Sequence, residues 1–150
     1  MIARWPGKIA EHSETEHLSA HWDLLPTAAE LAGVDVPSGI DGISFLPTLL
    51  GQDGQKQHDY LYWETTGKSG WQAIRKGNWK AHLQQVGDPA RTTFELYDLF
   101  SDIAEEHDVS ATSPEISREM RQLLASARTV PQSNSEILVA SPKKKSKAEE

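Results

Sequence analysis

The 150-residue sequence contains no cysteine. Within this chain that absence excludes disulfides, thiolate metal sites and a cysteine nucleophile, while the redox compartment stays open. Long apolar runs are lacking too, since no stretch approaches the roughly 20 residues of a membrane span. The first residues lack the charged start and apolar centre of a signal peptide. Positive charge is scarce at a formal net charge of −7, so we expect neither nucleic acid nor a membrane as the main partner.

Self-contained catalytic motifs are missing as well. The sequence has no phosphate-binding glycine loop, no G-x-S-x-G turn and no H-E-x-x-H helix. His17 and His21 have the four-residue spacing of metal ligands on one helix face, but the predicted helix starts after them, which favours surface or loop histidines. Asp35, Asp41 and Gly42 resemble part of a calcium loop, yet the alternating ligands and closing glutamate are absent, so we interpret them as turn residues.

Two acidic patterns leave a further choice open. Glu64 and Glu95, predicted on neighbouring strands, could form a carboxylate pair for acid and base catalysis, although exposed strand glutamates are far commoner. The segment "ELYDLFSDIAEEHDV" over residues 95–109 could attract a cation. The interpretation that we favour for it is a strand that ends in a capped turn.

Helix signals punctuate the first third of the chain. After a strand end and loop over residues 1–20, the segment 23–33 predicts a helix in which Asp23 is the cap, Pro26 lies in the first turn and Gly33 is the stop. Its apolar face contains the residues Leu24, Leu25, Ala28, Leu31 and Ala32. A shorter helix of the same pattern follows over 44–51, with Ser44 as cap, Pro47 in the first turn and Gly51 at the end.

The remainder of the chain predicts a small α+β unit. Four short segments, "YLYWE", "WQAIR", "WKAHLQ" and "FELYDL", alternate with period two and predict an antiparallel sheet with a two-residue turn at Gly77 and Asn78. Residues 113–127 predict a helix that is capped by Ser113 and carries an apolar stripe. The stripe consists of Ile116, Met120, Leu123, Leu124 and Ala127. Residues 129–150, including "KKKSK", are predicted to be a disordered, solvated tail.

The order of these phrases resembles the C-terminal third of sulfatases. "IARWPGKI", "DLLPTAAELAGV", "DGISFLPTLLG", "YLYWE", "QAIRKGNWKAHL", "ELYDLFSDIAEEHDV" and "SPEI" follow one another as they do in that family, over residues 1–127. The resemblance implies an alkaline-phosphatase-like architecture. Residues 1–56 would be the last strand and helices of its α/β core, and residues 57–128 the four-stranded antiparallel sheet packed by a C-terminal helix.

The family's chemistry is the hydrolysis of sulfate esters or sulfamates by a formylglycine made in a C/S-x-P-S-R motif, with calcium held by aspartates and an asparagine or histidine. None of those motifs occurs in this sequence. No catalytic or metal residue is therefore carried onto this chain, which has no cofactor of its own and is expected to be inactive alone. Calcium and formylglycine are implied only for a full-length member.

The resemblance implies peripheral roles for two loops. In the family, loops of the C-terminal sheet often border the substrate pocket, which here points to residues 64–70 and 84–92. Lys68 and His82 are the candidate contacts with an anionic substrate, although a solvated lysine and a packed histidine are commoner. Lys80 and Arg75 match framework positions and are assigned structural roles. The implied partner is a sulfated small molecule or polysaccharide.

Two hypotheses remain. In the first, Met1 is an internal residue of a longer sulfatase, and a periplasmic or secreted location follows by analogy with the family. In the second, the chain is a free-standing, non-catalytic α+β interaction module that reuses the sulfatase C-terminal domain. The sequence does not determine the oligomeric state or the sulfated substrate.

Overall fold

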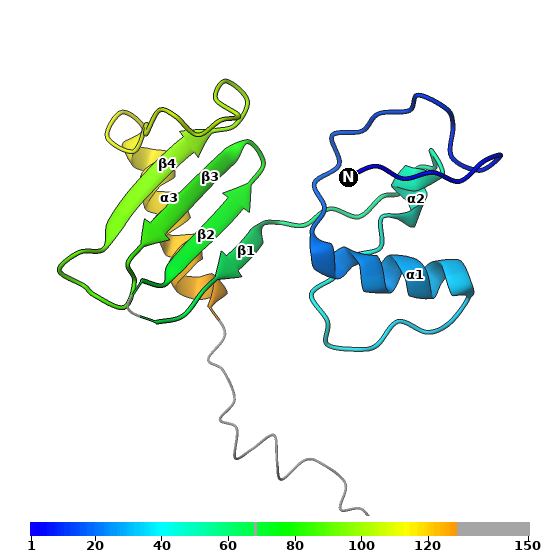
Figure 1. Cartoon of the computed structure of the whole chain (residues 1–150), viewed down its shortest axis with the longest axis horizontal. Coiled ribbons are helices and arrows are strands. Elements are labelled where there is room, and N and C mark those ends of the chain that lie inside the picture. Colours follow the sequence, from blue (N-terminus) through cyan, green and yellow to red (C-terminus); the bar gives the residue numbers. More distant parts are fainter. Residues whose placement is uncertain (68, 129–150) are drawn as a thin grey trace, which may run out of the picture.

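The computed structural model describes residues 1–67 and 69–128 (Figure 1). Its elements, in chain order, are the 3-10 turn η1 (His21–Asp23), the helices α1 (Leu24–Ala32) and α2 (Leu46–Leu49), the strands β1 (Leu61–Glu64), β2 (Trp71–Lys76), β3 (Trp79–Gln84) and β4 (Thr93–Asp98), and the helix α3 (Pro114–Ala127). In Figure 1, α1 and α2 lie on one side and the sheet with α3 on the other. No helix in the described part is long and apolar enough to cross a membrane. The tail over residues 129–150 lies outside it.

Residues 1–20 form turns and loops rather than the expected strand end. The N–H groups of Lys8 and Ile9 both donate to the Trp5 carbonyl at 3.0 Å, so the chain turns there. Met1 and Ile2 are 82% and 99% exposed. A strand needs a neighbour for its backbone hydrogen bonds, and among the described residues the only sheet is the one formed by β1 to β4. The described residues of this chain supply no such neighbour, and the place of this segment in the core of a longer enzyme stays a prediction.

Helix α1 ends as predicted but begins differently. Gly33 closes it with a left-handed φ of +68°. Asp23 precedes the helix, but its side chain makes no cap hydrogen bond, because its own backbone is helical (φ −75°, ψ −14°) rather than extended. The Asp23 carboxylate instead accepts hydrogen bonds from the N–H groups of Ala20 (2.7 Å) and Ile43 (2.8 Å). This carboxylate therefore connects the segments before and after the helix.

The face that α1 buries is not its leucine face. Thr27 and Ala29 are buried, whereas Leu24, Leu25 and Leu31 are 44%, 54% and 52% exposed. The apolar face that the sequence predicts is present, but within the described residues it is left open to solvent. Of the twelve large hydrophobic side chains that are exposed in residues 1–67 and 69–128, nine belong to residues 1–40. The N-terminal part of the chain thus presents apolar surface rather than enclosing it.

Helix α2 is a single turn that lies against α1. Ser44 Oγ accepts a hydrogen bond from the Leu46 N–H at 3.2 Å, close to the predicted cap. Thr27 Oγ1 accepts one from the N–H of Phe45, a buried residue, at 3.1 Å. Gly42 allows this close approach, because a Cβ there would lie 2.5 Å from the Trp22 carbonyl oxygen. The predicted turn at Gly42 is therefore also a tight packing position.

The four predicted strands form one antiparallel sheet in the order β1-β2-β3-β4. Lys76 pairs with Trp79, so β2 and β3 are joined by the predicted two-residue turn, in which Gly77 has a φ of +57°. Such a turn matches the twist of the two strands. Because the chain reverses at each turn, the β1–β2 and β3–β4 connections lie at the same end of the sheet.

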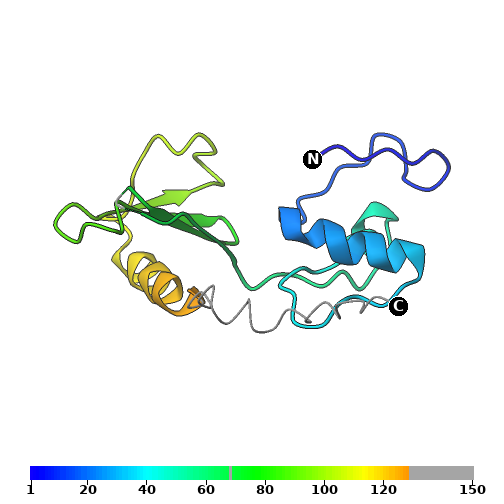
Figure 2. The same cartoon turned by 60° about the horizontal axis from the view of Figure 1, so that its bottom comes forward.

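Helix α3 covers one face of this sheet and completes the core. Pro114 opens it as predicted, whereas the side chain of Ser113 makes no cap hydrogen bond. The predicted stripe is confirmed, since Met120 and Leu124 are each 1% exposed. They form a cluster with the strand residues Ile74, Ala81 and Leu96. In Figure 2, α3 lies on one side of the sheet and the connection from β4 to α3 rises on the other.

Candidate functional site

The second face of the sheet, away from α3, carries polar and aromatic side chains. Strand pairing places His82 of β3 opposite Ala73 of β2 and Glu95 of β4. Strand periodicity puts the side chains of Lys80 and Tyr97 on the same face, one pair further along. His82 therefore occupies the middle of this face, close to the end at which the β1–β2 and β3–β4 connections emerge.

The two loops that the sequence singles out meet at this end. The N–H of Val86 donates to the Gly70 carbonyl at 2.9 Å and ties one connection to the other. A hollow of about 560 Å³ lies between them. Its lining consists of Ser69, Trp71, His82, Gln84, Gln85 and Arg91. We call this the loop hollow. The structure thus joins His82 to both predicted loops, whereas Lys68 lies outside the described residues.

The surroundings of His82 favour its neutral form. Burial, followed by the neighbouring Lys80 ammonium, lowers the pKa of His82 below its usual value, although Glu105 and Glu95 oppose this effect. The Tyr97 ring meets the imidazole edge-on, with 5.9 Å between centroids. His82 Nε2 is buried without a hydrogen-bond partner among the described residues, although Glu105 Oε2 lies 3.2 Å from it. A neutral imidazole can both donate and accept a hydrogen bond.

Arg91 supplies positive charge to the loop hollow. It is exposed, on a turn in which its N–H donates to the Asp88 carbonyl at 2.9 Å. A guanidinium group suits bidentate contact with sulfate or carboxylate oxygens. Sequence reasoning included the loop but did not single out Arg91. A cation inside a predicted pocket loop was the signal that could have identified it.

The two framework residues make local contacts. Lys80 forms an ion pair with Glu105, and both side chains are 25% exposed. Arg75 Nε donates to the Gly77 carbonyl at 3.1 Å and so braces the β2–β3 turn. These contacts agree with the structural roles expected for both residues.

A second hollow, of about 570 Å³, lies beside the connection that enters β1. Next to it, His58 Nε2 hydrogen-bonds to both oxygens of the Asp23 carboxylate, at 2.9 and 3.0 Å. Asp23 is fully buried, and the rings of Trp22 and Trp63 meet nearby with centroids 5.7 Å apart. This polar junction fastens the N-terminal part to the segment before the sheet.

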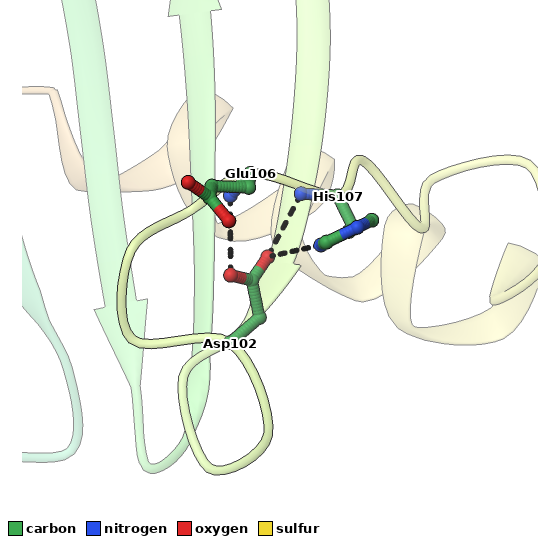
Figure 3. A group of neighbouring side chains, drawn as sticks. All are labelled: Asp102, Glu106 and His107. Carbon is green, nitrogen blue, oxygen red and sulfur yellow. Dashed lines mark hydrogen bonds and ion pairs between the residues drawn. The ribbon is translucent and has the colours of Figure 1, made fainter.

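The acid-rich segment forms the capped turn that the sequence favours. Figure 3 shows Asp102, Glu106 and His107 converging in the β4–α3 connection. The Asp102 carboxylate accepts the backbone N–H groups of Glu106 (3.1 Å) and His107 (2.8 Å). These bonds lower the pKa of Asp102. Calcium requires six to eight oxygen ligands, and two carboxylates and an imidazole do not supply them. These three residues therefore do not fit the calcium that the family resemblance implies.

The structure does not bring the other candidate groups together. Glu64 and Glu95 lie on β1 and β4, the two edges of the sheet, so their interpretation as a carboxylate pair is wrong. His21 is in η1 whereas His17 lies in the preceding loop, so they share no helix face. The segment with Asp35 and Asp41 is the irregular connection between α1 and α2, which agrees with turn residues.

The family model and the curated relatives identify the same family. Residues 1–130 match the family described as N-sulphoglucosamine sulphohydrolase, C-terminal. Arylsulfatase A of Homo sapiens is 33% identical over 146 residues, which cover 81% of this chain and 29% of that protein. The N-acetylgalactosamine-6-O-sulfatase of Bacteroides thetaiotaomicron is 29% identical over 141 residues, covering 85% of this chain and 27% of that protein.

Solved structures agree with the sequence matches. The structure of BT4656 in complex with its substrate D-glucosamine-2-N,6-O-disulfate has a TM-score of 0.58 and 25% sequence identity, and the match covers 70% of this chain and 23% of that one. The chain thus spans less than a third of the length of the relatives it matches. Its four-stranded sheet with a C-terminal helix and the match over residues 1–130 place it, as the resemblance of its phrases implied, in the sulfatase family, as a C-terminal sulfatase domain.

Proposed function

We propose that this chain is the C-terminal portion of a sulfatase whose complete form hydrolyses sulfate esters of a sugar, and that the loop hollow forms one wall of its substrate pocket. The observation that carries the proposal is the convergence of both β-sheet connections on one hollow that offers His82 and Arg91. Arg91 contacts the anionic group and Trp71 packs on the sugar. Sulfated sugars are the substrates named for two of the relatives described above.

The proposal divides the chain into two functional parts. Residues 1–56 belong to the α/β core of the complete enzyme, and the exposed leucines of α1 pack there against the remainder of that core. Residues 57–128 form the subdomain that carries the loop hollow. The large share of exposed apolar side chains in residues 1–40 supports this division, because isolated proteins rarely expose contiguous apolar surface.

A binding experiment tests the role of the loop hollow. The 150-residue chain, labelled with ¹⁵N, is titrated with N-acetyl-D-galactosamine 6-sulfate. Resonance shifts are expected at Trp71, His82 and Arg91. Arg91→Gln should weaken binding about fivefold, because one exposed charge contact is worth roughly 1 kcal/mol. The matched control is Arg118→Gln, which removes the same charge from an exposed site on α3. Equal weakening by both variants would show that net charge, and not a contact of Arg91, explains the loss of binding, and would refute the proposal.

An activity assay tests whether the chain alone lacks sulfatase activity. The chain alone should not hydrolyse p-nitrophenyl sulfate in the presence of calcium, because its sequence lacks C/S-x-P-S-R. Turnover that depends on calcium and exceeds the buffer rate would contradict the proposed division.

The second candidate, a free-standing interaction module, is favoured by one observation, the self-contained core of the sheet and α3. The DNA upstream of Met1 discriminates between the two. An in-frame C/S-x-P-S-R motif supports the sulfatase portion, whereas a promoter and ribosome-binding site directly before Met1 support the module.

A further inference from the structure

Glu105 makes two contacts across the second face of the sheet. It lies in the β4–α3 connection, yet one carboxylate oxygen pairs with Lys80 Nζ and the other lies 3.2 Å from His82 Nε2. One carboxylate from a loop therefore lies against two side chains of β3, as an ion pair with Lys80 and as a close approach to His82 that is not a hydrogen bond. His82 lines the loop hollow, so Glu105 lies against a residue of the proposed binding surface.

The backbone at Glu105 is held in an unusual conformation. Its φ is +56°, in the left-handed region that side chains other than glycine rarely adopt. Such conformations cost roughly 1–3 kcal/mol and persist only where surrounding contacts impose them. Here the loop is fastened on both sides, since Asp102 caps it and Asp108 Oδ1 accepts the Leu96 N–H at 3.0 Å. The position of the Glu105 carboxylate is thus determined by the fold.

The negative charge of Glu105 beside His82 favours one position for the imidazole proton. An ionised carboxylate presents only lone pairs, and an unprotonated ring nitrogen also presents a lone pair. The approach lies outside hydrogen-bond geometry, since the buried Nε2 has no hydrogen-bond partner among the described residues. The negative charge of Glu105 at 3.2 Å nevertheless repels a lone pair on Nε2 and attracts an N–H there. In the neutral ring this favours the proton on Nε2, with Nδ1 as the acceptor.

We propose that Glu105 is a positioning residue that holds His82 as the Nε2–H tautomer, so that Nδ1 accepts a hydrogen bond from a sugar hydroxyl or amide N–H in the loop hollow. This inference rests on the proposed function of that hollow. A sulfate group has no proton to donate, so His82 recognises the sugar and Arg91 recognises the anion. The two side chains thereby divide the recognition of a sulfated sugar between them.

Other groups around the ring set its charge and orientation. Lys80 from the same strand disfavours a protonated imidazole, whereas Glu95 from β4 and Glu105 from the loop favour it. Gln84 holds Glu95 through a 2.7 Å hydrogen bond, and the Tyr97 ring packs edge-on against the imidazole. Burial lowers the pKa of His82 further, so the ring is neutral near pH 7 and its tautomer is the property that matters.

Long-range ¹H–¹⁵N NMR spectra of the full chain report the tautomer directly, without any ligand. At pH 7.5 we expect His82 to show a protonated Nε2 and an unprotonated Nδ1. Glu105→Gln should shift the ring toward a mixture of tautomers and lower its titration midpoint, because Glu105 raises the pKa of His82. A ring protonated on Nδ1 in the unmodified chain, or spectra that are identical in the variant, would overturn the proposal.

Two further variants separate positioning from folding. Glu105→Gly removes the carboxylate while easing the left-handed backbone, so it keeps the loop folded and should still lose the tautomer preference. Lys80→Met removes the other partner of Glu105. It should retain the tautomer and raise the midpoint, because Lys80 lowers the pKa of His82. Loss of the preference in Lys80→Met and its retention in Glu105→Gly would assign it to general packing.

Ligand titration distinguishes this inference from the proposed function. Unsulfated N-acetyl-D-galactosamine should move the Nδ1 resonance of His82, whereas sodium sulfate should move only Arg91. A response of Nδ1 to sulfate alone would contradict the acceptor role. If neither probe nor the sulfated sugar moves any resonance of the hollow, the proposed function fails, while the tautomer is decided by the ligand-free spectra.

Discussion

Replacing Asp23 by asparagine should weaken the junction between the two parts of the chain. The carboxylate is fully buried and accepts hydrogen bonds from Ala20, Ile43 and His58. An amide has nearly the same shape but only one acceptor oxygen, and its NH₂ group would face a donor. Asp23→Asn thus changes the polarity of the site while its volume is nearly kept.

The size of the effect follows from the number of donors left without a partner. An unsatisfied buried donor costs about 1–3 kcal/mol, and more than one donor meets this carboxylate. Asparagine satisfies part of the network, so we expect a loss of roughly 2–4 kcal/mol in the free energy of unfolding the junction. That is a large share of the stability of a small domain, about 5–15 kcal/mol.

Urea unfolding followed by tryptophan fluorescence measures this loss, since Trp22 and Trp63 lie against each other at the junction. Hydrogen exchange at the amides of Ala20 and Ile43 localises it. The control is Asp41→Asn, which neutralises an exposed carboxylate in the same region. A change below about 1 kcal/mol in Asp23→Asn, or an equal change in the control, would refute the role assigned to the buried carboxylate.

Three further predictions concern stability. Leu124→Ala should destabilise the sheet and α3 by about 2–5 kcal/mol in urea unfolding, because it opens a cavity under a side chain that is 1% exposed; a loss under 1 kcal/mol would contradict the assigned core. Gly42→Ala should destabilise the packing of α1 by about 1–3 kcal/mol, since the new Cβ meets backbone 2.5 Å away; unchanged thermal unfolding would count against that close approach. The hydrogen bond from Tyr62 is the main cause of the lowered pKa of Glu64. The stability that ionised Glu64 contributes is therefore present above its unfolded-state pKa and is lost as the pH falls through its folded-state pKa. Tyr62→Phe should therefore raise the pKa of Glu64 in an NMR titration and reduce the acid dependence, and an unchanged midpoint would exclude that hydrogen bond as the cause.

The C-terminal subdomain could be predicted from local patterns. Period-two segments, a glycine turn at Gly77 and an apolar stripe on residues 114–127 specify their own partners, because each buries one face against the next. The N-terminal part could not be predicted in this way. Its leucines indicate a helix face that needs a cover, and the described residues of this chain do not provide one.

The site was predictable only in part. The antiparallel order implies that the two loops emerge at one end, and the sequence marked both loops and His82. It did not single out Arg91 or Glu105, since the roles of these two residues depend on where the loops place them. For Glu64 and Glu95, the prediction of neighbouring strands is wrong. Their strands form the two edges of the sheet, which excludes the alternative of a carboxylate pair.

The sequence by itself determined the helices, the four strands, their short turns and the family, because these depend on spacing between neighbours along the chain. Only the tertiary structure decided which side chains meet. It turned Asp23 from a helix cap into the centre of a buried junction with His58, and it brought Glu105 from a distant loop against His82. Such contacts join residues more than twenty positions apart, and their geometry is set by the packing of whole elements rather than by local pattern.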